Sequence, residues 1–228
     1  LGYPPDELTT VNRHAVHFLR ELQYAADNDK VLISGCVGPR KDVYNAQDTM
    51  SSGQAYSYHG EQVRSLALAD VDVISAMTMN YSGEAIGIVR AARTMGVPVV
   101  ISFTLTSDGN LPSGESLAEA IGTVDQATEN YTHYFMINCT QVQHFRPALQ
   151  QNGKWKDRLR GIRANAAIEE KTTEEEYDSS VSGNTPSQIK AFLDIQKRLP
   201  RLQIIGGCGG TDHKLVERAC SYLGTQSY

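Results

Sequence analysis

The stretch LQIIGGCGGTDH (residues 202–213) decides the fold class, because an apolar run ends abruptly at glycines that surround one cysteine. A short apolar run bounded by glycine is typical of a β-strand that is buried on both faces, as in a parallel sheet. Five other segments share this pattern: KVLISGCVGP (30–39), VDVISAMTM (71–79), VPVVISFTL (97–105), YFMINCT (134–140) and LRGIRANA (159–166). The sequence therefore predicts six strands.

Segments with helical features lie between these runs. Ser116 and Glu119 form a capping-box pattern, and Gly96 stands where a helix C-cap is expected. The expected helices are 62–69, 84–96, 116–127 and 185–199. Strands that alternate with helices predict βα units and a parallel sheet.

The ends of the strands favour a closed barrel over an open doubly wound sheet. An open sheet often carries a G-x-G-x-x-G turn after its first strand, and SGCVGP (34–39) is not that turn. In a (β/α)8 barrel the carboxyl ends of the strands meet at one site. Six runs end in polar or reactive residues: Cys36, Thr78, Thr104, Cys139, Asn165 and Cys208. The sequence predicts an α/β barrel, of which it supplies six of eight strands.

Composition excludes several classes of protein. The chain has 228 residues, of which 40% are hydrophobic and 21% charged, with a formal charge of −5. This mild acidity argues against a nucleic-acid partner, and no apolar run approaches the roughly 18 residues that would span a membrane. Four widely spaced cysteines argue against a disulfide scaffold and for a reducing, cytoplasmic location. A homo-oligomer is compatible with this composition.

Cys139 and Cys208 are candidate metal ligands, because each ends a strand. Zinc favours thiolates, and a catalytic zinc site has three protein ligands and one open position. The alternative is that each thiol simply packs, since free cysteine is among the most buried residue types. Two separated cysteines do not decide between these interpretations.

Several segments resemble the homocysteine S-methyltransferase family. IIGGCGGTDH (204–213) resembles its GGCCGT signature, and MINCTQ (136–141) resembles its strand ending in NC. ISGCVGPRKDVY (33–44) and ISFTLTSDGNLPSGESLAEAI (101–121) match further motifs in order. The resemblance implies a (β/α)8 barrel with zinc held by three cysteines. It also implies methyl transfer to homocysteine from donors such as S-methylmethionine, betaine or methylfolate.

The resemblance also implies that the six runs are strands three to eight of the barrel. We therefore expect residues 1–228 to form a single domain that is incomplete at its N-terminus. Cys139 and Cys208 match two of the family's zinc ligands, whereas the third falls at Gly209. His213 is the expected replacement ligand, with Asp212 as another candidate. Alternatively, both residues only begin the next helix.

The expected substrate-binding residues are Thr78 and Asn165, which match family positions at strand ends. Met77 stands where the family carries a glutamate that contacts the amino-acid substrate. Arg163 is a candidate for contact with a substrate carboxylate, although an exposed arginine more often has no such role. We interpret Cys36 as a packing residue.

The resemblance, together with these residues, implies a zinc-dependent methyltransferase whose partners are a small-molecule thiol acceptor, most simply homocysteine, and a methyl donor. The changes at Gly209 and Met77 motivate an alternative, a metal-free family member that binds a small amino acid or a partner without methyl transfer. A third hypothesis is different chemistry on the same fold, since a fold does not determine function.

Overall fold

The computed structural model describes residues 4–27, 30–44, 46–165, 194–199 and 201–224. Its six strands are all parallel and follow one another in chain order across a single sheet. The strands are β1 (Ser34–Val37), β2 (Val73–Met79), β3 (Val99–Phe103), β4 (Tyr134–Thr140), β5 (Leu159–Ala164) and β6 (Ile204–Gly207). All six predicted strands are confirmed.

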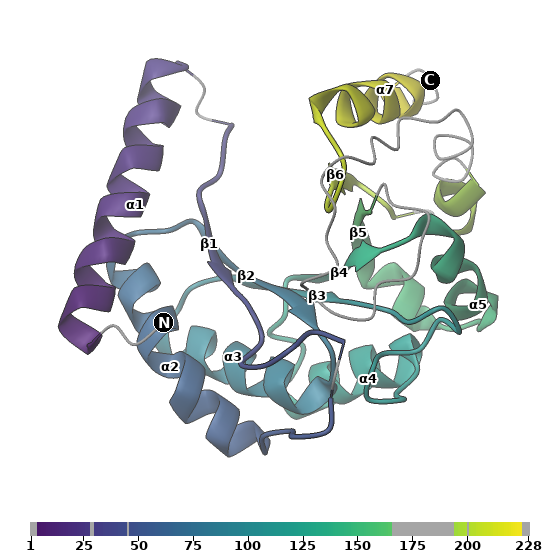
Figure 1. Ribbon diagram of the computed structural model, residues 1–228, viewed down its shortest axis with the longest axis horizontal. Helices are drawn as coiled ribbons and strands as arrows, with labels where there is room; N and C mark the ends of the chain where they lie inside the picture. The colour runs from purple at the N-terminus through teal and green to yellow at the C-terminus, as the bar shows by residue number, and fades with distance from the viewer. Residues whose placement is uncertain (1–3, 28–29, 45, 166–193, 200, 225–228) are drawn as a thin grey trace.

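Helices cover the outer side of the sheet, which curls into a partial barrel between the edge strands β1 and β6 (Figure 1). The helices are α1 (Pro5–Ala25), α2 (Ser52–Leu68), α3 (Ser82–Met95), α4 (Leu117–Ala127), α5 (Phe145–Gln150) and α7 (His213–Gly224). Two short 3-10 helices, η1 (Val142–His144) and η2 (Lys154–Asp157), lie on either side of α5. The predicted arrangement of six βα units from a (β/α)8 barrel is therefore confirmed.

Local sequence signals explain where several helices begin and end. The Ser116–Glu119 capping box begins α4 as predicted, and Gly96 ends α3 with a left-handed φ of 67°. A second capping box, formed by Ser51 and Gln54, begins α2 and was not predicted. The helix expected at 185–199 lies largely outside the described residues, although 194–198 are helical.

The two faces of the sheet differ in chemistry. Apolar side chains such as Ile74, Ile101 and Phe135 are fully buried and belong to the main core cluster. On the inner face, Ser34 and Ser75 share a hydrogen bond of 2.6 Å between β1 and β2. Alternation along parallel strands thus places the apolar core outside the barrel wall and polar groups inside it.

An ion pair joins α1 to the amino end of the sheet. Arg20 donates to the Oδ1 atom of Asp72 at 2.9 Å, and the other carboxylate oxygen accepts from the backbone N–H of Ile33. The hydrogen bond from Arg20 lowers the pKa of the Asp72 carboxyl. Elsewhere α1 leaves apolar side chains exposed: Val11, Phe18, Leu19, Leu22 and Tyr24.

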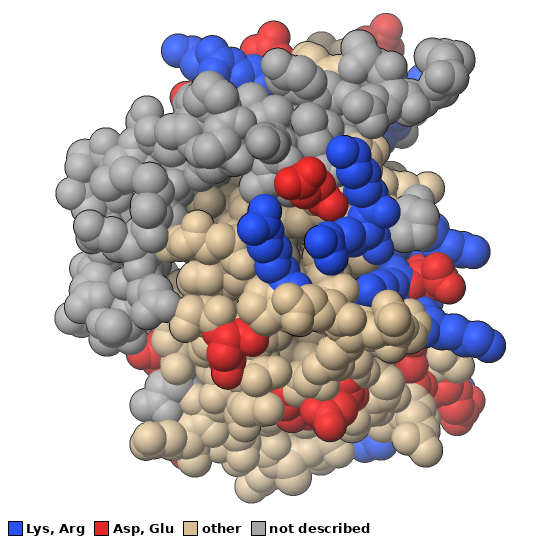
Figure 2. Space-filling model, turned by 90° about the vertical axis from the view of Figure 1, so that its right-hand side faces the viewer, with Lys and Arg blue, Asp and Glu red and all other residues tan. Residues whose placement is uncertain are grey.

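Charged side chains are unevenly distributed over the surface. Lys and Arg gather on the side of the molecule where α5 lies, with Asp and Glu among them (Figure 2). Surface ion pairs join Arg146 to Asp194 at 3.9 Å and Arg201 to Asp157 at 3.6 Å. The charges therefore form a mixed patch.

In the part of the chain that the structure describes, every helix is too short or too polar to cross a bilayer.

The contact between α2 and α3 generates a stability prediction. A Cβ atom at Gly87 would lie 2.4 Å from the Cβ of Ala55 and 2.6 Å from the backbone nitrogen of Tyr56. Because backbone cannot easily give way, we expect Gly87→Ala to lower the free energy of unfolding by about 1–3 kcal/mol. Urea denaturation measures this change.

Gly122→Ala is the matched control, since Gly122 also lies within a helix but a Cβ there meets no atom within 4 Å. This variant should be neutral or more stable by up to about 1 kcal/mol, through helix propensity. Equal destabilisation of both variants would contradict the close packing of α2 on α3.

Candidate active site

Cys139 and Cys208 lie side by side at the carboxyl ends of the strands. Cys139 is the penultimate residue of β4, and Cys208 follows β6 directly. The thiol of Cys139 donates a hydrogen bond to the sulfur of Cys208. The structure therefore brings together the two cysteines that the sequence singled out as candidate metal ligands.

The surroundings of Cys208 stabilise its thiolate. The hydrogen bond from the Cys139 thiol is the largest influence and lowers the pKa of Cys208 to about 6, against the opposing effect of desolvation. Backbone N–H groups of Gly209 and Cys139 also donate to this sulfur, and the positive charge of Arg163 adds to the effect. Hydrogen bonds to the charged form of an acid favour that form. Cys208 is thus prepared to act as an anionic ligand or nucleophile near neutral pH.

Glycine is required near Cys208 for a different structural reason at each of two positions. A Cβ atom at Gly207 would lie 2.0 Å from the Oγ1 atom of Thr211, because Thr211 folds back over the strand end. Thr211 donates from its backbone N–H and its hydroxyl to the carbonyl of Cys208. Gly210 has a φ of 73°, a left-handed conformation that glycine adopts without strain. These residues let the chain turn tightly just beyond the thiol.

Asn138 joins three neighbouring strands through its buried side chain. Its Oδ1 atom accepts from the backbone N–H of Thr78 at 2.9 Å and from the Ser102 hydroxyl at 2.6 Å. Its Nδ2 atom donates to the Oγ1 atom of Thr78 at 2.8 Å. Sequence analysis did not single out Asn138, although its place directly before Cys139 was a signal. A polar residue in an otherwise apolar strand needs a partner.

Two residues beside these hydrogen bonds have left-handed backbones. Thr78 has a φ of 62° and Cys139 a φ of 53°, and the strand register shifts near both. Such conformations cost roughly 1–3 kcal/mol in a residue other than glycine and persist where surrounding contacts hold them. The hydrogen bonds of Asn138 hold Thr78 directly and lie one residue from Cys139. They therefore help to aim the Cys139 thiol.

The structure places the remaining predicted residues as follows. Asn165 is buried, and its Oδ1 atom accepts from the backbone N–H of Gly209 at 3.1 Å. His213 is the first residue of α7 and is exposed. Met77 is buried beside Thr78 in β2.

The interpretation of Cys36 as a packing residue is wrong. Its side chain is exposed, because β1 is an edge strand of a sheet that does not close.

The thiol pair supplies two ligands of the kind that a zinc site uses. Thiolates are preferred ligands for zinc, and catalytic zinc sites take three from the protein. Among the described residues, no three side chains of His, Cys, Asp and Glu lie close enough together to hold a metal ion. The chemistry of Cys139 and Cys208 thus fits zinc, and the described residues do not bring a third ligand to them.

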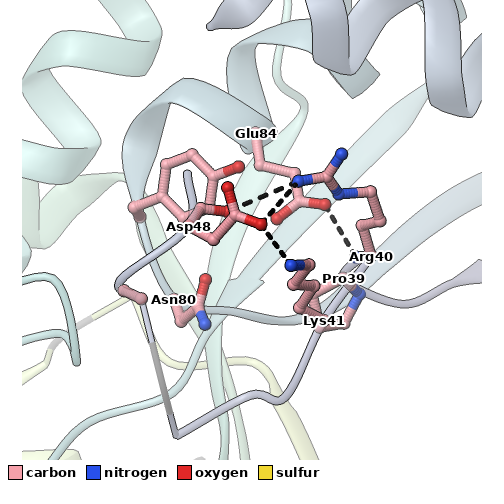
Figure 3. Close-up of a pocket in the computed structure, with 8 residues that line it drawn as sticks. Pro39, Arg40, Lys41, Asp48, Asn80 and Glu84 are labelled. Carbon is pink, nitrogen blue, oxygen red and sulfur yellow. Dashed lines mark hydrogen bonds and ion pairs between the residues drawn. The ribbon is translucent and has the colours of Figure 1, made fainter. Parts of the chain in front are cut away.

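A second cluster of polar residues lies in the loop after β1 and near the start of α3 (Figure 3). Neither Cys139 nor Cys208 lines its cavity. Buried Glu84 accepts from the backbone N–H of Arg40 and from the Nε2 atom of His59, both at 2.8 Å. Lys41 and Arg40 pair with Asp48 in front of it. The cavity between these residues is about 10 Å³, which matches a single water molecule. These contacts anchor the loop after β1 to α3, and the cavity is too small for an amino acid.

Parallel βα units with polar and thiol side chains at the carboxyl ends of the strands define a partial barrel of the (β/α)8 class, whose sites lie at that face. The family model described as "Homocysteine S-methyltransferase" matches residues 2–223. The chain belongs to the homocysteine S-methyltransferase family. A sequence search of the curated proteins found no match.

Solved structures of the homocysteine methyltransferase MmuM from Escherichia coli share this fold. The metallated form has 17% sequence identity and a TM-score of 0.73, covering 97% of this chain and 73% of that chain. The apo form has 17% identity and a TM-score of 0.71, covering 97% and 75%. The oxidized form has 18% identity and a TM-score of 0.73, covering 98% and 73%. The chain thus spans about three quarters of these relatives, as a partial barrel.

The hydrogen bonds of Asn138 generate a second stability prediction. Asn138→Ala leaves the partly buried groups of Thr78 and the buried hydroxyl of Ser102 without their partner, so it should lower the free energy of unfolding by about 2–4 kcal/mol. Ser102→Ala removes only one of these bonds and should cost about 1 kcal/mol. Urea denaturation of both variants checks this order. Similar values would show that Asn138 does not join the three strands.

The thiols of Cys208 and Cys36 should differ in reactivity. In metal-free protein, alkylation of Cys208 should rise with a midpoint near pH 6, since only the thiolate reacts and its pKa is about 6. Desolvation raises the pKa of Cys36, so its alkylation should require a higher pH than that of Cys208. Iodoacetamide labelling followed by peptide mass spectrometry measures both profiles. If Cys36 had the lower midpoint pH of alkylation, the result would contradict a hydrogen bond that stabilises the thiolate of Cys208.

Proposed function

We propose that this protein transfers a methyl group to the sulfur of a small-molecule thiol, with homocysteine as the acceptor and methionine as the product. The observation that carries the proposal is the contact between Cys139 and Cys208, with the pKa of Cys208 lowered to about 6. Family membership supports the same class of reaction. The solved structures of MmuM include a metallated form, which supports the proposal that this protein binds a metal.

In this proposal Cys139 and Cys208 hold a zinc ion. Zinc would stabilise the acceptor sulfur as a thiolate at neutral pH. The thiolate sulfur forms a bond to the donor's methyl carbon while that carbon's bond to the donor breaks, and the bonding electrons leave with the donor. We propose His213 as the third ligand, because an imidazole is a competent zinc ligand. This role requires the exposed side chain at the start of α7 to move toward the thiols when zinc binds, since the structure does not group it with them.

The chain's own residues organise the site around the acceptor. Asn165 fixes the loop after β6 through its bond to Gly209, so the position of Cys208 relative to β5 is defined. Thr78 is held at the end of β2 by Asn138. We propose that Thr78 and Asn165 border the acceptor and restrict its orientation. Positioning of the two reactants contributes to the rate by removing the entropy cost of bringing them together.

A specific observation supports a second candidate function. Gly209 occupies the position where a third cysteine was expected, and the described residues bring no third ligand to the thiol pair. A family member that lacks a third metal ligand would bind a small amino acid or a protein partner without transferring a methyl group. Its thiols would then be structural.

Zinc content distinguishes these functions. We expect about one zinc per chain in reduced protein and its loss in Cys139→Ser and in Cys208→Ser, since two thiolates are the strongest ligands present. Elemental analysis measures the metal, and methionine formation from homocysteine and S-methylmethionine measures activity. His213→Ala should lower zinc affinity if His213 is the third ligand.

Cys36→Ser is the matched control, because Cys36 is a free cysteine at the carboxyl end of another strand. It should retain both zinc and activity. Absence of zinc from the unmodified protein after reconstitution would contradict the zinc-thiolate proposal and favour binding without turnover.

A further inference from the structure

We propose that Arg163 selects the acceptor by binding a carboxylate on it, so that the site takes thiols that carry a carboxylate and does not require an ammonium group. This inference rests on the proposed function, since it concerns the acceptor of the same site. According to this inference, one side chain of β5 determines which class of substrate the site binds.

The charge distribution of the barrel wall supports an anionic ligand. The six described strands contain no Asp or Glu, and their only charged residues are Arg160 and Arg163. Arg160 lies near the start of β5 and donates to the Oε1 atom of Gln203. Arg163 is the penultimate residue of the same strand and is exposed. The strand ends thus present one positive charge without a negative charge from the strands to balance it.

The backbone of β6 holds Arg163 in place. Arg163 pairs in register with Gly206, and a Cβ atom there would lie 2.9 Å from the Cγ of Arg163. The aliphatic part of Arg163 therefore lies over a glycine that has no side chain. Its Nε atom donates to the carbonyl of Gly207 at 3.2 Å. This is the one hydrogen bond of its guanidinium among the described residues. The two terminal NH2 groups of a guanidinium have the planar geometry that binds a carboxylate.

Arg163 also lies next to the thiols in the sheet. It pairs in register with Asn138, the residue before Cys139, and its Nε atom bonds to Gly207, the residue before Cys208. An acceptor whose sulfur lies beside Cys139 and Cys208 therefore has a guanidinium nearby. A carboxylate is the group that this planar donor recognises best, through two parallel hydrogen bonds.

The six described strands offer no comparable partner for an ammonium group. Met77 is buried and apolar beside Thr78, at the same end of the sheet. The polar side chains nearby, Thr78 and Asn138, already bond to one another. The described strands therefore offer a binding partner for the carboxylate of an acceptor and none for its ammonium group.

Three acceptors test this inference. Homocysteine carries both charges, 4-mercaptobutanoate only the carboxylate, and 3-aminopropane-1-thiol only the ammonium. We expect the unmodified protein to use or bind the first two similarly and the third much more weakly. In Arg163→Met, kcat/KM for the two carboxylates should fall about 10- to 100-fold, mainly through KM, because a charge-assisted hydrogen bond is lost. The value for 3-aminopropane-1-thiol should change less than about 3-fold.

Two further variants separate recognition from folding. Arg160→Met removes the other arginine of β5 and should leave all three acceptors unchanged. Gly206→Ala keeps the charge but displaces Arg163, so it should reproduce the carboxylate-selective loss. An equal loss for all three acceptors in Arg163→Met, or the same selective loss in Arg160→Met, would overturn the inference.

Binding measured by calorimetry distinguishes failure of the inference from failure of the proposed function. If no acceptor is methylated but both carboxylate thiols bind with a dependence on Arg163, the inference holds and the methyl-transfer function fails. If methylation occurs with no preference for a carboxylate, the function holds and the inference fails. If no thiol is bound or methylated, both fail.

Discussion

The side chain of Asn138 is the constraint on which the candidate site depends. It bonds to Thr78 and Ser102, and so it fixes the carboxyl ends of β2, β3 and β4 relative to one another. The next residue, Cys139, has a left-handed backbone that an isolated strand would not adopt. Without the buried amide, both the strand ends and the direction of the thiol would lose their restraint.

A second restraint acts from the other side of the thiol pair. The backbone N–H of Cys208 donates to the carbonyl of Ala164, and the backbone N–H of Gly209 donates to Asn165. These contacts bind the loop after β6 to the end of β5. Because Cys139 and Cys208 are each positioned by hydrogen bonds to neighbouring strands, their mutual contact needs little reorganisation. Preorganised donors of this kind stabilise an anion without a further cost at the moment of reaction.

Electrostatics and packing act together around this pair. The wall of the half-barrel contributes one exposed positive charge, Arg163, and the glycine opposite it leaves room for its stem. In the proposed match to the family's zinc ligands, Gly209 stands where a third thiolate is expected. A zinc site with one anionic ligand fewer would be more positive and would favour an acceptor that brings negative charge of its own.

Much of the architecture could be predicted from the sequence alone. Six short apolar runs identified every strand that the structure describes, because strands buried on both faces leave a continuous signal. The capping box at Ser116 and the C-cap at Gly96 gave two helix boundaries for equally local reasons. Family motifs indicated Cys139 and Cys208. These features depend on neighbours in the chain, so the sequence by itself determined them.

Only the tertiary structure decided what these residues do together. The contact between the Cys139 and Cys208 thiols, the three bonds of Asn138 and the exposure of Cys36 all join or separate segments far apart in the chain. The packing of Arg163 on Gly206 depends on which residues of β5 and β6 lie opposite one another. Strand register and sheet curvature set these distances. They arise from the packing of the whole barrel wall, which no local pattern in the sequence encodes.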